Sequence, residues 1–148
     1  LLIGQAPGPD GDPDKPLEGQ IGRRLAGLAG LTEADYLVRT DRLNVFNQHP
    51  GKNGKGDAFD PDVAKARAGE IRELVKGRRV LFLGRRVAEA FGFGKADLPL
   101  MTWEQSGRLK AEVAVIPHPS GIVRWWNNEE NSEAAGEFLR KLLRRANG

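Results

Sequence analysis

The first eight residues constrain the fold more than any other stretch. Residues 1–3 are a short apolar run, and residues 4–8 read Gly-Gln-Ala-Pro-Gly. The run predicts a buried strand, and the segment after it predicts a tight turn at the carboxyl end of that strand. A second apolar run, residues 113–116, ends in a similar turn, Pro-His-Pro-Ser-Gly, at residues 117–121. Ligands of open α/β sheets bind outside the carboxyl ends of strands, so the two turns predict one site between them.

Strand and helix patterns alternate along the rest of the chain. Asp60 followed by Pro61 predicts a sharp helix start, with the helix ending at Gly77. We expect strands at 36–38, 43–46, 79–83 and 109–116, the last with a hairpin partner before Gly107, and helices at 19–31, 61–76, 85–91 and from a cap at Asn131-Ser132 to Arg145. This alternation predicts an α/β fold with a mainly parallel sheet covered on both faces.

Length and composition bound the class of protein. A chain of 148 residues predicts one domain, residues 1–148. It contains no cysteine, which excludes disulfides, thiolate zinc sites and cysteine-held iron–sulfur clusters. No apolar run approaches the length of a membrane span, so we expect no membrane partner. Because the chain starts at Leu1 on a strand, we expect residues upstream of it.

The charge balance is mildly basic. The net charge is +3, with an isoelectric point near 9.4. Such an excess suits a polyanionic partner such as nucleic acid, because Lys and Arg displace counterions from phosphates. It is equally compatible with a simple contribution to solubility, and charge alone does not separate the two interpretations.

Three polar side chains are expected to face the predicted site. Gln5 lies in the first turn and Asn44 in the predicted strand at 43–46, and each amide offers a donor and an acceptor to the edge of a base. His118 lies between two prolines, where an imidazole would stabilise a developing anion. Asn44 can instead be a strand-end turn former, and His118 a structural histidine.

The loop after the first turn is acidic. Asp10, Asp12 and Asp14 have the spacing of a calcium loop, but Lys15 and Ile21 stand where that loop needs Gly and Glu, which excludes an EF-hand. These aspartates are interpreted as loop formers, or one of them orients a water molecule.

An apolar and basic segment follows the second turn. Ile122 or Val123 could fill the gap left by an extruded base, and Arg124 could bind phosphate. In the alternative interpretation, Trp125 and Trp126 simply pack against the final helix.

Together these segments resemble the uracil-DNA glycosylase superfamily over nearly the whole chain. Residues 4–8 resemble its first motif, in the Gly-Glu-Ala-Pro-Gly form of a thermostable bacterial and archaeal branch. Residues 16–22 resemble the Pro-Phe-Val-Gly-x-Ala-Gly segment that follows there. Residues 43–45 resemble the strand-end Asn-Val motif, and residues 118–121 resemble the His-Pro-Ser motif. The order of the motifs along the chain matches as well.

The resemblance implies a three-layer α/β/α sandwich with a central four-stranded parallel sheet. It implies a DNA glycosylase of base excision repair that flips an altered base out of single- or double-stranded DNA. The resemblance further implies a cytoplasmic, nucleoid-associated protein, or a nuclear one in a eukaryote. We expect a monomer with no cofactor and no metal.

The chain departs from the family pattern at its acids. Gln5 and Ala6 stand where branches of the family have glutamate and aspartate, so Asp12, or else Asp10, is expected to substitute. Leu17 stands where an aromatic ring stacks on the base, and Phe46 is expected to supply that ring instead. The four cluster-binding cysteines of the closest branch are missing.

The first hypothesis is therefore a metal-independent glycosylase acting on uracil or another altered base. The second is a module of the same fold that binds a nucleobase or nucleic acid without cleaving it, and the third is an unrelated α/β domain. The expected site residues are His118, Asp12 and Gln5 for catalysis, Gln5, Ala6, Asn44 and Phe46 for the base, and Ser120, Gly121, Ile122, Val123 and Arg124 for DNA.

Overall fold

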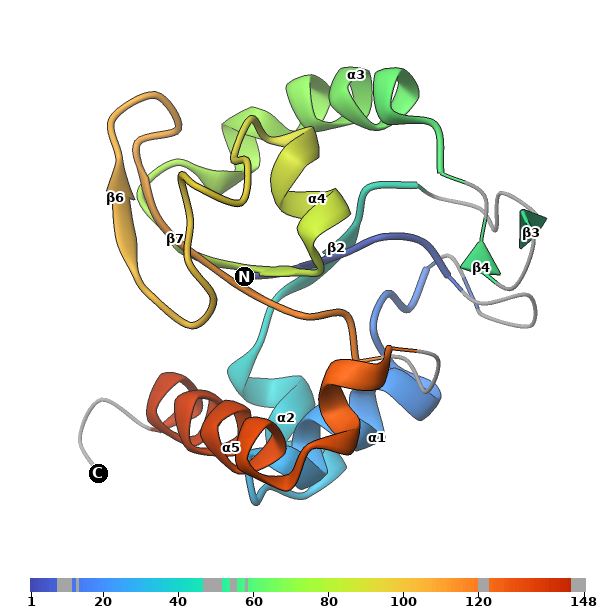
Figure 1. Ribbon diagram of the computed structural model, residues 1–148, viewed down its shortest axis with the longest axis vertical. Helices are drawn as coiled ribbons and strands as arrows, with labels where there is room; N and C mark the ends of the chain where they lie inside the picture. The colour runs from blue at the N-terminus through green and yellow to red at the C-terminus, as the bar shows by residue number, and fades with distance from the viewer. Residues whose placement is uncertain are drawn as a thin grey trace.

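The fold is a three-layer α/β/α sandwich, shown by the computed structural model in Figure 1. The structure describes residues 1–7, 12, 14–46, 52–53, 56–57, 59–119 and 123–144. Within them, the central sheet has the strand order β2-β1-β5-β7-β6. Its strands are β1 (Leu2–Gly4), β2 (Arg42–Asn44), β5 (Arg79–Leu83), β6 (Glu104–Ser106) and β7 (Ala111–Ile116).

The expected count of four strands is corrected to five. Strands β2, β1, β5 and β7 are parallel, as predicted, and β6 pairs antiparallel with β7 at the edge of the sheet. The hairpin partner expected before Gly107 is thus a strand of the main sheet. A separate antiparallel pair, β3 (Lys52–Asn53) and β4 (Gly56–Asp57), lies between β2 and the next helix along the chain.

Helices cover both faces of the sheet, as Figure 1 shows. One face carries α1 (Gly19–Leu28), α2 (Glu33–Arg39), the 3₁₀ helix η2 (Arg124–Asn127) and α5 (Glu129–Leu143). The other face carries α3 (Pro61–Ile71), the 3₁₀ helix η1 (Arg72–Val75) and α4 (Arg85–Ala90). Among the helices of the described segments, none is long and apolar enough to cross a membrane.

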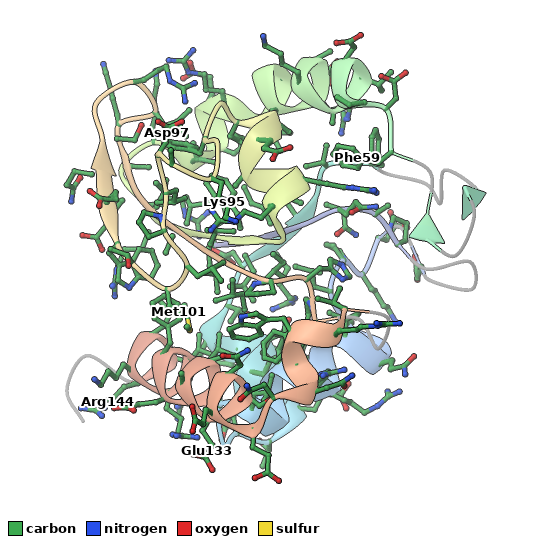
Figure 2. The ribbon with its side chains drawn as sticks, viewed as in Figure 1. Phe59, Lys95, Asp97, Met101, Glu133 and Arg144 are labelled. Atoms are coloured by element: carbon green, nitrogen blue, oxygen red, sulfur yellow. The ribbon has the colours of Figure 1, made fainter. Side chains whose placement is uncertain are left out.

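The central strands are mostly apolar because both of their faces are largely buried. Val80 and Phe82 of β5 pack into the core on the α3 and α4 side, whereas Leu81 and Leu83 pack into the core on the α1, α2 and α5 side. Side chains fill the space between the layers (Figure 2). Alternation along each strand therefore decides which helical layer a residue faces.

Local signals set several helix starts as predicted. The Asp60 carboxylate accepts hydrogen bonds from the main-chain N–H groups of Asp62 (2.9 Å) and Val63 (3.3 Å), and Pro61 opens α3. The helix ends earlier than expected, at Ile71, and η1 continues it before Gly77 turns the chain with φ +73°.

Two predictions of local structure were wrong. Residues 36–38 belong to helix α2, because Thr32 caps that helix through Asp35 and Tyr36 is buried against the α1 layer. The tertiary contact outweighs the strand preference of Tyr-Leu-Val. Helix α5 is capped by Asn128 rather than by Asn131-Ser132, since Asn128 accepts from Glu130 and Asn131. Its described part ends at Leu143, and Arg145 lies outside the described residues.

The connections place a switch point in the middle of the sheet. From β1 the chain passes through α1 and α2 to β2 on one side, and from β2 it passes through α3 to β5 on the other side of β1. In such sheets a crevice forms outside the carboxyl ends of the strands where the direction changes. Here that place lies beyond the ends of β1 and β5.

Candidate functional site

The four parallel strands reach their carboxyl ends on the same side of the sheet, here called the carboxyl edge. The predicted site residues follow the strands there. Gly4 pairs with Asn44 in register, and the ladder continues as Val45 N–H donates to Gly4 (2.9 Å) and Phe46 N–H donates to Gln5 (2.9 Å). The first turn and the second strand end therefore form one continuous piece of backbone. This brings the backbone of Gln5, Asn44 and Phe46 together at the ends of β1 and β2.

Gly4 is a point of very close packing. A Cβ atom at this position would lie 2.5 Å from Leu17 Cδ2 and 2.6 Å from Asn44 Oδ1. Only glycine admits both side chains at the end of β1. Leu17, which precedes α1, therefore touches the same spot as Asn44 and on the same face of the sheet.

Leu17 is held in an unusual conformation. Its φ is +58°, in the left-handed region that favours glycine, and its side chain is buried. The hydroxyl of Tyr36 donates a buried hydrogen bond of 2.9 Å to the Leu17 carbonyl. Burial raises the pKa of Tyr36 above its ordinary value, so the hydroxyl keeps its proton. Backbone strain of this kind concentrates at functional sites.

Asn44 carries an unsatisfied polar atom. The residue is 9% exposed, and its Oδ1 is buried without a hydrogen-bond donor among the described residues. An unpaired buried acceptor costs about 1–3 kcal/mol, and the great majority of buried polar atoms in folded proteins have a partner. An N–H or O–H group brought in by a ligand would remove this cost.

His118 lies beyond the end of β7 and against the end of β5. It is half-buried, and its carbonyl accepts a 2.8 Å hydrogen bond from the indole Nε1 of Trp126. Gly84, with φ +107°, is so close that a Cβ there would lie 3.3 Å from His118 Cβ. The histidine thus follows the strand next to β5, whereas Asn44 follows the strand on the far side of β1.

Phe46 packs away from Asn44. Its ring meets Phe59 edge-on, with centroids 5.4 Å apart and an interplanar angle of 77°, and it joins the core on the α3 and α4 side. Arg86 lies over Phe59, 5.4 Å from the ring centroid. The apolar side chain beside Asn44 is Leu17 instead. Stacking of Phe46 on a base stays a prediction.

Asp12 has the geometry of a loop former. Its side chain is exposed, its carboxylate accepts a hydrogen bond from the Asp14 N–H (2.9 Å), and its carbonyl accepts one from the Lys15 N–H (3.0 Å). Gln5 and Ala6 are half-buried directly after β1. Asp10 lies outside the described residues. That Asp12, or else Asp10, substitutes for the missing acid stays a prediction.

The segment after the second turn is described only in part. Ser120, Gly121 and Ile122 lie outside the described residues. Val123 packs partly against the α1 and α5 core, and Arg124 is exposed at the start of η2. Trp126 is 5% exposed within that core, so the packing interpretation is correct for this tryptophan. Its bond to His118 was not foreseen, because periodicity carries no signal for a contact across a turn.

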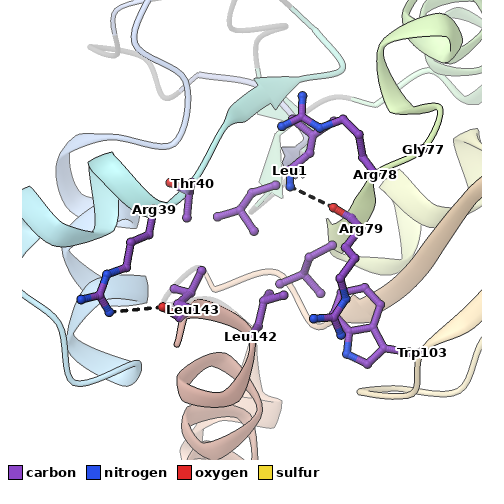
Figure 3. Close-up of a pocket in the computed structure, with 11 residues that line it drawn as sticks. Leu1, Arg39, Thr40, Gly77, Arg78, Arg79, Trp103, Leu142 and Leu143 are labelled. Atoms are coloured by element: carbon purple, nitrogen blue, oxygen red, sulfur yellow. Dashed lines mark hydrogen bonds between the residues drawn. The ribbon is translucent and has the colours of Figure 1, made fainter. Parts of the chain in front are cut away.

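A cavity of about 360 Å³ lies at the opposite, amino edge of the sheet (Figure 3). Each arginine at this cavity has at least one partner, although Arg39 Nε is buried without an acceptor among the described residues. Arg78 pairs with Asp41, whose pKa is lowered by that hydrogen bond, Arg79 pairs with Glu112, and Arg39 donates to the Leu143 carbonyl. Among the described residues, no three His, Cys, Asp or Glu side chains are grouped as a metal site would require. The candidate site is therefore the carboxyl edge.

Comparison with known proteins adds no relative to this picture. No family model matches the chain, and no curated protein matches it. The candidate site therefore rests on the residues themselves: the packed Gly4, the unpaired Asn44 and the anchored His118.

Proposed function

We propose that the chain is a DNA glycosylase that hydrolyses the bond between deoxyribose and uracil or another altered base. The observation that carries this proposal is the Oδ1 of Asn44, which is buried beside the Gly4 turn without a donor among the described residues. An asparagine amide recognises the edge of a base through paired donor and acceptor groups. A flat base with an N–H on its edge would supply the donor that Oδ1 lacks.

His118 suits the departure of the base. When the C1′–N bond breaks, its electron pair stays on the base, which leaves as an anion. A histidine at the carboxyl edge of the sheet would stabilise that anion by a hydrogen bond or by charge. Water then bonds through its oxygen to C1′, and its displaced proton ends on the base. A catalytic group in such a role accelerates the reaction by about 10²- to 10⁴-fold.

Placement of the water is assigned to Gln5 or Asp12. Gln5 follows β1 directly and is half-buried, whereas Asp12 is exposed in its own turn. A glutamine amide positions water without accepting its proton. We therefore expect a slower reaction than one with a carboxylate base. The basic charge and the exposed Arg124 are consistent with contacts to DNA phosphates.

A second function, base binding without cleavage, is favoured because Gln5 is neutral and Asp12 is exposed. A protein of this fold with an exposed Asp12 and a neutral Gln5 could hold a flipped base without hydrolysing its bond. Flipping costs a few kcal/mol, which binding alone can offset. Affinity that depends on the base, together with no product after long incubation, would decide for this function.

The test is a panel of oligonucleotides that carry uracil or other altered bases, in single and double strands. We expect an alkali-labile abasic site with at least one base. His118→Ala should form this site about 10²- to 10⁴-fold more slowly. His118→Gln keeps a hydrogen-bonding side chain but cannot become charged, so it separates the two modes of stabilisation. Asn44→Ala should weaken the preference for the altered base. Wild-type protein that releases no base from any oligonucleotide would refute the proposal.

A further inference from the structure

We propose that Trp126 is a positioning residue for His118, an inference that rests on the proposed function. The indole Nε1–H of Trp126 donates a 2.8 Å hydrogen bond to the His118 carbonyl across eight positions of sequence. The bond joins helix η2 to the turn that follows β7. It therefore fixes the peptide from which the imidazole projects.

Trp126 can act in this way because its own ring is immobilised. The residue is 5% exposed, and the hydroxyl of Ser132 in α5 donates a 2.7 Å hydrogen bond to its carbonyl. Trp125 meets its ring edge-on at 4.8 Å, and Arg24 of α1 lies 5.4 Å from the ring centroid. Ser132 of α5 and Arg24 of α1 thus hold the indole whose N–H binds His118, whereas the edge-on contact of Trp125 is one that a phenylalanine ring also makes.

Three further residues restrict the backbone at His118. Gly84 at the end of β5 lies against His118, because a Cβ there would be 3.3 Å from His118 Cβ. Pro117 and Pro119 fix their own φ angles, and Pro119 restricts His118 to extended backbone. The indole N–H adds a restraint on the His118 carbonyl, and so helps to fix the Cα–Cβ bond from which the imidazole projects.

The bond also completes the hydrogen bonding of a buried tryptophan. A buried indole N–H needs an acceptor, and a core of aliphatic side chains offers none. Here the acceptor belongs to the one histidine that the proposed reaction uses. Replacement by phenylalanine keeps an aromatic ring in the core but removes the donor together with the second ring of the indole. The same replacement at a neighbouring tryptophan is therefore needed to separate positioning from packing.

The experiment compares Trp126→Phe with Trp125→Phe, the same change one residue away in the same 3₁₀ helix. A misplacement near 1 Å costs about 10²-fold in rate. We expect Trp126→Phe to slow single-turnover base release by about 10- to 100-fold with little change in DNA affinity, and Trp125→Phe to remain near wild type. Equal losses in the two variants, or a loss confined to DNA affinity, would overturn the assignment.

A double variant tests whether Trp126 acts through His118. In the His118→Ala background, Trp126→Phe should cause no further decrease, because residues that act as a unit are not additive. A full additional decrease would mean that Trp126 acts elsewhere, which overturns the inference.

An NMR measurement keeps the inference testable without any activity. The chain has two histidines, and the spectrum of His118→Ala assigns their ring signals. Relaxation of His118 Cε1 should show a rigid ring in wild type and in Trp125→Phe, and a mobile ring in Trp126→Phe. A ring that stays rigid in Trp126→Phe overturns the positioning role. Absence of base release by wild type would instead refute the proposed function.

Discussion

Replacement of Gly4 by alanine tests the geometry of the site most sharply. The new Cβ would lie 2.5 Å from Leu17 Cδ2 and 2.6 Å from Asn44 Oδ1, whereas real Cβ contacts stay above about 3.0 Å. Neither neighbour retreats easily, because Tyr36 holds the Leu17 backbone and the β1–β2 ladder holds Asn44. Overpacking of this kind costs about 1–3 kcal/mol.

Urea titration measures the loss of stability directly. With a slope of about 2 kcal/mol per molar, the midpoint of Gly4→Ala should fall by about 0.5–1.5 M. The displaced Asn44 amide should also abolish the preference for an oligonucleotide that carries the altered base. Urea titration thus reports the effect of the clash on stability, and the binding preference reports its effect on the Asn44 amide.

Gly69→Ala is the matched control. Gly69 lies in helix α3, and a Cβ there meets nothing within 4 Å. Alanine is a better helix former, so the control should be unchanged or more stable by about 0.5–1 kcal/mol. Equal stability of Gly4→Ala and wild type would refute the packing that places Leu17 and Asn44 at the end of β1.

Two further predictions concern the layer beneath the site. Tyr36→Phe removes the buried donor to the Leu17 carbonyl and should cost about 1–3 kcal/mol in urea titration. Because burial raises the pKa of Tyr36, the folded state keeps a proton that the unfolded state loses above about pH 10. Stability should therefore fall as pH rises above that value and, within this pH window, fall less in Tyr36→Phe. Tyr36 is the only tyrosine, so absorbance of the phenolate reports its titration alone. Asn128→Ala should cost about 0.5–2 kcal/mol, since Asn128 caps α5, and the exposed Asn127→Ala should cost less. A larger loss in Asn127→Ala would contradict the observed cap.

The sequence predicts elements best where two local signals agree. Asp60 and Pro61 together mark the start of α3, and an uninterrupted apolar run marks β5. The strand prediction for residues 36–38 was wrong. Aromatic Tyr36 and β-branched Val38 favour a strand, but the Tyr36 hydroxyl makes a tertiary hydrogen bond from a helix. Local propensity cannot anticipate a bond to a residue 19 positions away.

The candidate site was predictable in part. The ends of β1 and β7 were recognisable from glycine and proline turns after apolar runs, which placed Gln5 and His118 at one edge. The strand predicted at 43–46 contains Asn44, but β2 ends there at Asn44 itself. The neighbours of these residues were not predictable. Leu17 beside Asn44 depends on a left-handed backbone at a residue other than glycine, and Trp126 at His118 depends on packing of η2 against α5.

Direct detection of the released base is the measurement closest to the central claim. Mass spectrometry would follow free base and abasic DNA from one altered oligonucleotide, with wild type and His118→Ala side by side. We expect wild type to release the two products in equal amounts, and His118→Ala to release them about 10²- to 10⁴-fold more slowly. Intact DNA from wild type across the panel, or release that does not depend on His118, would contradict it.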